Sequence, residues 1–188
     1  MRARVAVLIS GRGSNMASLV EASRAPDCPY EIVLVVSNVP DAPGLAFAAA
    51  NGIPQFALSH KGTKRAEFDA IVDGALRDAK VEYVALAGYM RLLSPEFVAG
   101  WSGRMINIHP SLLPAYKGLD THERALAAGD TRHGCTVHIV TEALDDGPIR
   151  AQAEIPILDG DDADALATRV LIEEHKLYPA ALADFVRR

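Results

Sequence analysis

The sequence predicts an α/β fold in three layers, with a mostly parallel central sheet and antiparallel strands in its C-terminal part. Three observations support this prediction. Up to Pro114, short apolar segments alternate with helical segments, a pattern typical of parallel strands joined by helical crossovers. Several of these short segments are apolar throughout, as expected for strands that are covered on both faces. After Pro114, two strand-like segments flank a turn-rich stretch, which favours an antiparallel pair.

The elements follow from this pattern in chain order. The parallel strands are predicted at residues 5–10, 31–37, 55–58, 83–87 and 105–108, with helices at 15–23, 44–50, 64–79 and 95–100. Beyond Pro114 we expect a short helix at 121–128, strands at 135–140 and 149–157, and a long helix from about residue 163 to the end. No linker or repeat interrupts the pattern, so residues 1–188 are expected to form one domain.

Composition narrows the class of protein. The chain has 188 residues, 49% of them hydrophobic and 23% charged, which is typical of a globular domain. A net charge of −5 without a basic cluster argues against nucleic acid as a partner. The apolar run 5–9 is too short to span a membrane, and no cleavage site follows it, so a cytoplasmic protein is expected. Cys28 and Cys135 lack metal-ligand spacing, so no metal site is expected.

A glycine loop follows the first predicted strand, with the sequence Ser-Gly-Arg-Gly-Ser-Asn-Met at residues 10–16. Such a loop presents unpaired backbone N–H groups at a helix N-terminus, where an anion is favoured. A dinucleotide site would need a third glycine at Met16 and an acidic residue near Asn38, and a P-loop would need a lysine. We therefore expect a single phosphate rather than NAD. The alternative is a tight turn without a ligand.

Asn107 and His109 stand two positions apart at the end of the fifth predicted strand, so their side chains point to one face of the sheet. Pro110 and Pro114 then end the strand and open a loop. An amide can donate to a developing oxyanion, and an imidazole suits proton transfer near neutral pH. Asp145, in a second turn-rich loop, could orient His109 and favour its charged form. Together these groups suit acyl transfer without a covalent intermediate.

Each of these residues also has a purely structural interpretation. Asn107 could cap a loop, His109 could be an ordinary loop histidine, and Asp145 could form an Asx-turn. The remaining histidines are expected on the surface or in packing roles, with His138 the least secure because it lies in a strand pattern. They are His60, His122, His133, His138 and His175.

Four segments together resemble the phosphoribosylglycinamide formyltransferases, the folate-dependent formyltransferase family of purine synthesis. They are Ser-Gly-Arg-Gly-Ser-Asn at 10–15, Leu-Ala-Gly-Tyr-Met-Arg-Leu-Leu at 86–93, Asn-Ile-His-Pro-Ser-Leu-Leu-Pro at 107–114 and Leu-Asp-Asp-Gly-Pro at 144–148. The resemblance implies a Rossmann-like formyltransferase fold. It also implies transfer of a formyl group from 10-formyltetrahydrofolate to the glycine amine of 5-phosphoribosylglycinamide (GAR), without a metal or NAD. The sequence does not distinguish a monomer from a homodimer.

The resemblance implies roles for individual residues as well. Residues 1–100 would form the half that binds the ribonucleotide phosphate, and residues 101–188 the folate-binding and catalytic half. The apolar character of Met90, Leu92 and Leu93 suits a flat heteroaromatic ring, and the alternative is that these residues are ordinary core. The implied sets are Asn107, His109 and Asp145 for catalysis; Gly13, Ser14, Asn15, Met16, Ala17 and Glu174 for GAR; and Arg65, Met90, Arg91, Leu92, Leu93 and Asn107 for folate.

Three features depart from the family pattern. Asp120 stands where the family usually has histidine, Arg12 lies inside the phosphate loop, and the chain ends at Arg188, earlier than in familiar members. Arg12 could add a charge contact to the phosphate or project into water. Residues 114–131 are expected to form a lid over the folate, with Gly118 and Gly129 as hinges.

Two alternatives to this function remain open at this point. One is another enzyme that uses 10-formyltetrahydrofolate, either a different transferase or a hydrolase of the same fold. The other, from a different class, is a nucleotide-binding Rossmann module without catalysis. The missing third glycine and the absent ribose-binding acid speak against this second alternative.

Overall fold

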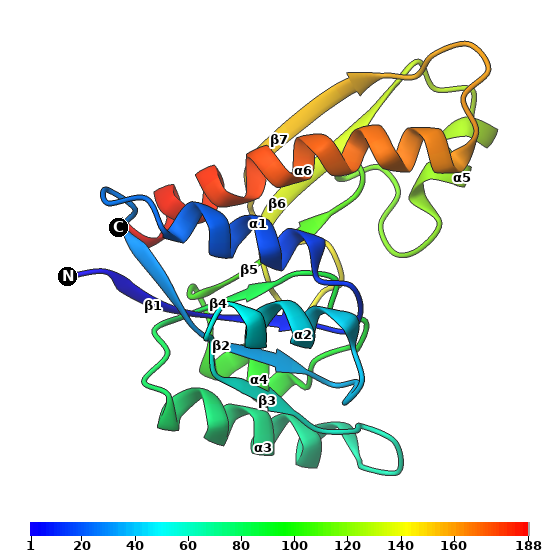
Figure 1. The fold of residues 1–188 in the computed structure, drawn as a ribbon. Helices are drawn as coiled ribbons and strands as arrows, with labels where there is room; N and C mark the ends of the chain where they lie inside the picture. Colours follow the sequence, from blue (N-terminus) through cyan, green and yellow to red (C-terminus); the bar gives the residue numbers. More distant parts are fainter. Residues whose placement is uncertain (188) are drawn as a thin grey trace.

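A computed structural model describes residues 1–187 of the chain (Figure 1). Its strands and helices alternate along the sequence except at β6 and β7, which follow each other directly. The strands are β1 (Ala3–Ile9), β2 (Tyr30–Ser37), β3 (Gln55–Ala57), β4 (Tyr83–Leu86), β5 (Met105–His109), β6 (Arg132–Ile139) and β7 (Ile149–Pro156). The helices are α1 (Ser14–Ser23), α2 (Pro43–Ala50), α3 (Arg65–Asp78), α4 (Pro95–Gly100), α5 (Thr121–Ala127) and α6 (Ala163–Val186).

The strands form one sheet in the order β3-β2-β1-β4-β5-β6-β7. The pairs from β3 to β5 are parallel, whereas β6 and β7 are antiparallel to their neighbours. The predicted mixture of a parallel sheet with antiparallel C-terminal strands is therefore confirmed. Because the chain builds β2 and β3 on one side of β1 and then crosses to place β4 on the other, the strand order reverses between β1 and β4. In open α/β sheets, ligands bind beside the carboxyl ends of the strands at such a point.

Helices cover both faces of the sheet, which gives the expected three layers. Figure 1 shows α1, α2 and α6 on one face and α3 and α4 on the other. Successive β1 side chains alternate between two buried clusters: Val5 and Val7 pack with α1 and α6 residues, while Ala6 and Leu8 pack with α3 and α4 residues. This explains why β1 reads as continuously apolar.

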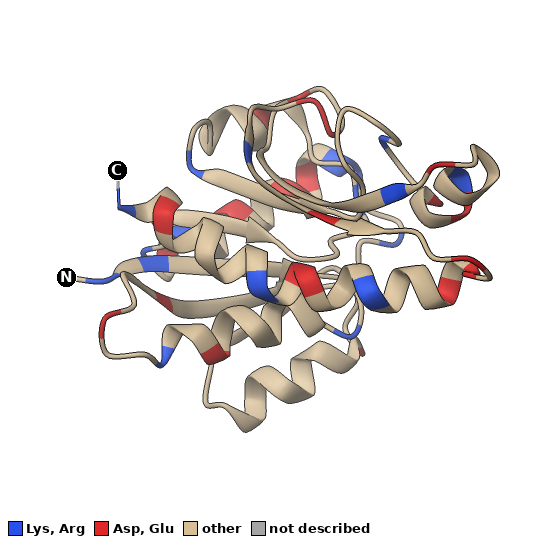
Figure 2. Cartoon of the chain, turned by 90° about the horizontal axis from the view of Figure 1, so that it is seen from above, with Lys and Arg blue, Asp and Glu red and all other residues tan. Residues whose placement is uncertain are grey.

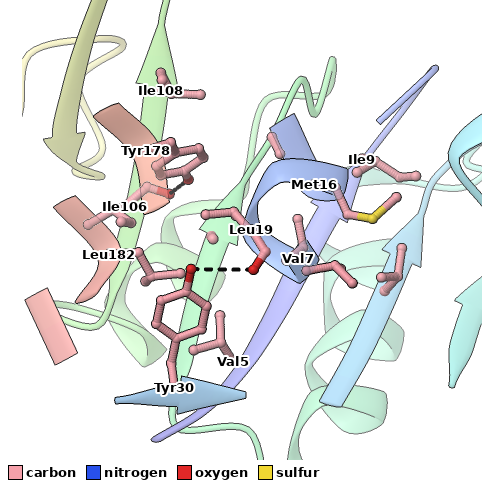
Figure 3. Packing of buried hydrophobic residues seen from close by; sticks show 14 of the residues in the cluster. Val5, Val7, Ile9, Met16, Leu19, Tyr30, Ile106, Ile108, Tyr178 and Leu182 are labelled. Atoms are coloured by element: carbon pink, nitrogen blue, oxygen red, sulfur yellow. Dashed lines mark hydrogen bonds between the residues drawn. The ribbon is translucent and has the colours of Figure 1, made fainter. Parts of the chain in front are cut away.

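The long helix α6 is tied to the centre of the sheet by a fully buried tyrosine. The hydroxyl of Tyr178 lies 2.8 Å from the carbonyl oxygen of Leu86 and 3.2 Å from that of Ile106. Figure 3 shows Tyr178 next to Ile106, in the same buried cluster as Met16 and Leu19 of α1. Burial raises the pKa of the Tyr178 hydroxyl well above its ordinary value, so it stays protonated and can donate.

The predicted boundaries are correct to within one or two residues, except at the start of β6. This strand begins at Arg132 rather than at residue 135. Gly134 explains the difference, because a Cβ added there would lie 2.0 Å from the carbonyl oxygen of Ala153 on β7. The sequence Arg-His-Gly resembles a loop, but the glycine is what lets the two strands approach closely.

Charged residues of both signs are interspersed over the molecule in the view of Figure 2. Among residues 1–187, no helix combines the length and the apolar content that crossing a membrane requires.

Replacing Gly134 with alanine is expected to lower the free energy of unfolding by about 1–3 kcal/mol, because the new methyl group overlaps the β7 backbone. Urea unfolding measures the change. Gly74→Ala is the matched control: it lies inside α3, where an added Cβ meets no atom within 4 Å, so it should be neutral or stabilising by up to about 1 kcal/mol. Equal stabilities of the two variants would contradict the close approach of β6 and β7.

Candidate active site

Two loops meet at the carboxyl ends of β1 and β4, where the strand order reverses. The glycine loop after β1 is joined to the segment after β4 through Ser10, whose hydroxyl oxygen accepts from the backbone N–H of Met90 at 2.8 Å. The same hydroxyl donates to the Asn38 side-chain oxygen at 2.5 Å, so it also reaches the end of β2. Both segments therefore lie at the crevice that the topology predicts.

The glycine loop enters α1 in a conformation suited to an anion. Gly13 has a φ of 70° and caps α1 without a side-chain cap. The backbone N–H groups of Ser14, Asn15 and Met16 belong to the first helical turn, which has no intrahelical acceptors for them. Ala17 differs, because its N–H already donates to the carbonyl oxygen of Gly13 at 2.8 Å. The backbone N–H groups that this loop can offer to an anion are therefore those of the residues before Ala17.

Asn15 and Glu174 meet although they lie far apart in the sequence. The Asn15 amide donates to the Glu174 carboxylate at 3.0 Å, which ties the start of α1 to the middle of α6. Glu174 is 6% exposed, and this burial raises the pKa of its carboxyl group. Within the described part of the chain, the other amide atom, Oδ1 of Asn15, is buried without a hydrogen-bond partner. Two predicted GAR-binding residues are thus neighbours.

The segment after β4 exposes apolar side chains at the crevice. Met90 is 68% exposed and Leu92 is 54% exposed, so the interpretation of these two residues as ordinary core is wrong. Leu93 instead packs against the cluster beneath, and Arg91 lies over the ring of Phe68 at 4.7 Å. Large apolar residues exposed beside polar groups are typical of a ligand site. Arg65 is exposed at the first turn of α3.

Asn107, His109 and Asp145 come together at the carboxyl end of β5, as the sequence predicts. The Asp145 carboxylate lies 3.4 Å from Nδ1 of His109, and both side chains are 7% exposed. His138 connects Asn107 to the same carboxylate: its Nε2 lies 3.2 Å from the Asn107 amide nitrogen and 3.6 Å from Asp145. Asp145 also accepts from the backbone N–H of Gly118 at 2.9 Å.

From the sequence, His138 is expected on the surface or in a packing role, as the least secure of the remaining histidines. It is buried at 3% exposure, but it faces the site because Asn107 and His138 are register partners in the β5–β6 pair. Its Nδ1 lies 3.1 Å from the Ile139 carbonyl oxygen, and burial lowers its pKa, so the neutral ring carries its proton on Nδ1. Nε2 then accepts from Asn107 and fixes the direction of that amide.

The loop between β5 and α5 holds the other side of His109. Nε2 of His109 lies 2.8 Å from the carbonyl oxygen of Tyr116, so this nitrogen carries a proton and donates it. The predicted lid is thus a short loop followed by α5, and both predicted hinges, Gly118 and Gly129, have positive φ. Asp120 precedes α5 with a φ of 56° and forms no side-chain cap.

His122 and His133 form a pair next to this loop. His122 Nδ1 and His133 Nε2 are 3.1 Å apart, and His133 is 1% exposed. Burial, with a smaller contribution from His122, lowers the pKa of His133 to about 4, and burial also lowers that of His122. The two rings are therefore neutral near pH 7 and share one hydrogen bond. Among residues 1–187, no group of three or more His, Cys, Asp or Glu side chains could hold a metal ion.

A groove also lies elsewhere on the molecule. It measures about 450 Å³ and is lined by α3 and the β2–β3 edge, including Leu34, Phe56, Ile71 and Asp78. A single carboxylate among apolar side chains offers little chemistry. The crevice at the ends of β1, β4 and β5 is therefore the candidate active site.

Comparison with known proteins agrees with this geometry. Residues 3–182 match the family model described as formyl transferase. The chain belongs to the formyl transferase family.

Relatives of this formyl transferase fall into two kinds. A phosphoribosylglycinamide formyltransferase of Haemophilus influenzae is 40% identical over 97% of the chain and 86% of its own length. The human trifunctional purine biosynthetic protein adenosine-3 is 48% identical over 96% of the chain, but the chain spans only 18% of that protein. The crystal structure of a Brucella melitensis phosphoribosylglycinamide formyltransferase has 51% identity and a TM-score of 0.95, covering 99% of this chain and 96% of that one. The expected Rossmann-like formyltransferase fold and the resemblance to this family are confirmed.

Acid is expected to destabilise this formyl transferase through His133. The unfolded chain has an ordinary histidine pKa of about 6.5, whereas the folded residue titrates at about 4. Between these values the unfolded state binds more protons, so the stability contributed by neutral His133 is present above about pH 6.5 and is lost as pH falls toward 4. The loss amounts to about 1–3 kcal/mol.

Urea unfolding at several pH values measures this effect. His133→Gln should flatten the dependence of stability on pH across this interval, whereas His60→Gln, which leaves the His122–His133 pair intact, should not. The other histidines with lowered pKa, His122, His138 and His175, add to the slope in every variant, so the difference between variants is the relevant quantity. Identical slopes for His133→Gln and the wild type would refute the assignment.

Proposed function

We propose that this chain transfers the formyl group of 10-formyltetrahydrofolate to the glycine amine of GAR, a step of purine biosynthesis. The observation that carries the proposal is the convergence of Asn107, His109 and Asp145 at the end of β5. An amide donor, an imidazole and a buried carboxylate are the groups that transfer through a tetrahedral intermediate requires. The names of the relatives that match nearly the whole chain support the same reaction.

In the proposed reaction, the neutral glycine amine attacks the formyl carbon and a new carbon–nitrogen bond forms. The electron pair of the carbonyl moves to oxygen, and the resulting oxyanion is stabilised by the Asn107 amide and protonated His109. The bond from the formyl carbon to N10 of the folate then breaks, and N10 takes up a proton that the amine has lost. The products are formyl-GAR and tetrahydrofolate.

The environment of each group fits its proposed role. Because Nε2 of His109 faces a carbonyl oxygen, the exchangeable proton is the one on Nδ1, which faces Asp145. At 3.4 Å that contact is long for a hydrogen bond, so the Nδ1 proton is available to an oxyanion. Asp145, which faces this nitrogen, helps to move the proton from the amine toward N10, directly or through water.

The substrate-binding roles follow from the two loops. The N-terminus of α1, from Gly13 to Met16, suits the phosphate of GAR, and the pair of Asn15 and Glu174 suits its polar ribosyl-glycinamide part. The exposed side chains of Met90 and Leu92 suit the flat pterin ring, with Arg91 and Arg65 near an anionic tail. Small molecules are thus the proposed partners, and a monomer or homodimer remains the expected state.

The pure protein mixed with GAR and a 10-formyl folate tests this function. Conversion followed by the ultraviolet absorbance of the folate should require both substrates. Replacing GAR with tRNA or with water alone tests other formyl acceptors, and replacing the folate with formate and ATP tests another donor. Conversion with water alone would favour a hydrolase, and conversion only with tRNA would favour another transferase. No conversion with any acceptor would remove the proposal.

Asn107→Ala is expected to lower kcat by roughly 10²–10³-fold, because the oxyanion loses a donor. The KM for GAR should change far less, since the amide acts mainly on the transition state. Steady-state kinetics with both substrates varied gives the two constants, and unfolding curves verify that the variant is folded. A kcat close to that of the wild type would show that Asn107 does not stabilise the oxyanion.

Asp145→Asn is expected to lower kcat by roughly 10²–10⁴-fold, because the carboxylate no longer supports proton transfer. Asparagine tolerates the left-handed backbone that Asp145 adopts, with a φ of 49°, so the loop should keep its shape. Glu142→Gln removes an exposed carboxylate from the same loop and serves as the control. If both variants retained full turnover, Asp145 would have no part in the chemistry.

A further inference from the structure

Arg124 of α5 binds the loop that contacts His109 and Asp145, which are called the catalytic pair below. Its Nη1 donates to the carbonyl oxygens of Lys117 at 2.6 Å and Leu119 at 3.1 Å. Its guanidinium also lies over the ring of Tyr116, 5.3 Å from the centroid. One side chain therefore holds three residues of a four-residue stretch.

The same stretch contacts His109 and Asp145 through its backbone. Tyr116 presents its carbonyl oxygen to Nε2 of His109 at 2.8 Å, and Gly118 donates its N–H to Asp145 at 2.9 Å. Residues 116 and 118 thus face the catalytic pair, while the carbonyl groups of residues 117 and 119 face Arg124. The loop therefore links Arg124 to the side chains of both His109 and Asp145.

This loop conformation depends on outside support. Tyr116 and Asp120 have φ values of 55° and 56°, in the left-handed region that side chains other than glycine rarely adopt. Such backbone persists only where neighbouring contacts hold it. The ion pair between Lys117 and Asp146 also spans the loop, but its partners are 38% and 56% exposed, so solvent and salt weaken it. Ser111 adds a hydrogen bond to the Tyr116 carbonyl at 3.3 Å.

We propose that Arg124 is a positioning residue for formyl transfer. Acting through the loop, it keeps the Tyr116 carbonyl on His109, which fixes the proton on Nε2 and leaves Nδ1 as the nitrogen that exchanges a proton beside Asp145. A planar guanidinium suits this role, because it can bond two carbonyl groups and stack on a ring at once. The effect on turnover rests on the function proposed above, whereas the effect on the His109 tautomer does not.

Two measurements on Arg124→Ala test the proposal. In ¹H–¹⁵N NMR spectra recorded under mildly alkaline conditions, wild-type His109 should show a proton on Nε2 and a bare Nδ1, with the signals assigned by their loss in His109→Asn. Arg124→Ala should show a mixture of both tautomers, and kcat at saturating substrates should fall by roughly 10–100-fold. Arg124→Lys should behave like the alanine variant, because an ammonium group cannot bridge both carbonyls and stack on Tyr116.

Arg132→Ala is the matched control, because Arg132 is an exposed arginine paired with Glu154 on β7. It should leave the tautomer and kcat unchanged. An unaltered His109 tautomer in Arg124→Ala would overturn the proposal whatever the activity, since a loss of turnover alone would then reflect general loosening of the loop. An altered tautomer with unchanged kcat would overturn it too. If the wild type transferred no formyl group, the proposed function would fail, and the NMR comparison would still decide what Arg124 does.

Discussion

The buried carboxylate of Asp145 is the group around which the polar end of this fold is arranged. At 8% exposure its charge has lost most of its hydration, so the surrounding groups must replace it. Gly118 supplies a backbone N–H at 2.9 Å. Burial keeps His138 neutral, so His138 supplies no charge. The remaining partner is the imidazole of His109, whose Nδ1 lies 3.4 Å from the carboxylate and faces it from the end of β5.

Close backbone packing between the Asp145 loop and β6 places this carboxylate beside β5. A Cβ on Gly147 would lie 1.7 Å from the carbonyl oxygen of Ile139, so only glycine lets the turn after Asp145 pack against the end of β6. The antiparallel pairing of β5 and β6 then sets His138 opposite Asn107. Each polar group of the site is thus held by backbone that the surrounding layers fix, and this rigidity is what a preorganised oxyanion site needs.

The two proposed substrates would draw on different physical forces. At the N-terminus of α1, unpaired N–H groups and the helix dipole favour an anion, while the exposed side chains of Met90 and Leu92 favour an apolar ring. Ser10 connects the two regions by its hydrogen bond to the backbone of Met90. The reversal of strand order between β1 and β4 brings both regions to the one edge where Asn107 and His109 emerge.

The sequence by itself determined the layers, the succession of strands and helices along the chain, and the shared face of Asn107 and His109. These features depend on local periodicity. It also located Asp145 and the glycine loop, whose side chains and spacing are specific. Only the tertiary structure decided that His138 faces Asn107 and that β6 begins at Arg132. It also decided that the backbone of Tyr116 and Gly118 contacts His109 and Asp145. The reason is physical: strand register and backbone hydrogen bonds arise from packing across the sheet, and a carbonyl or N–H group is the same in almost every residue type.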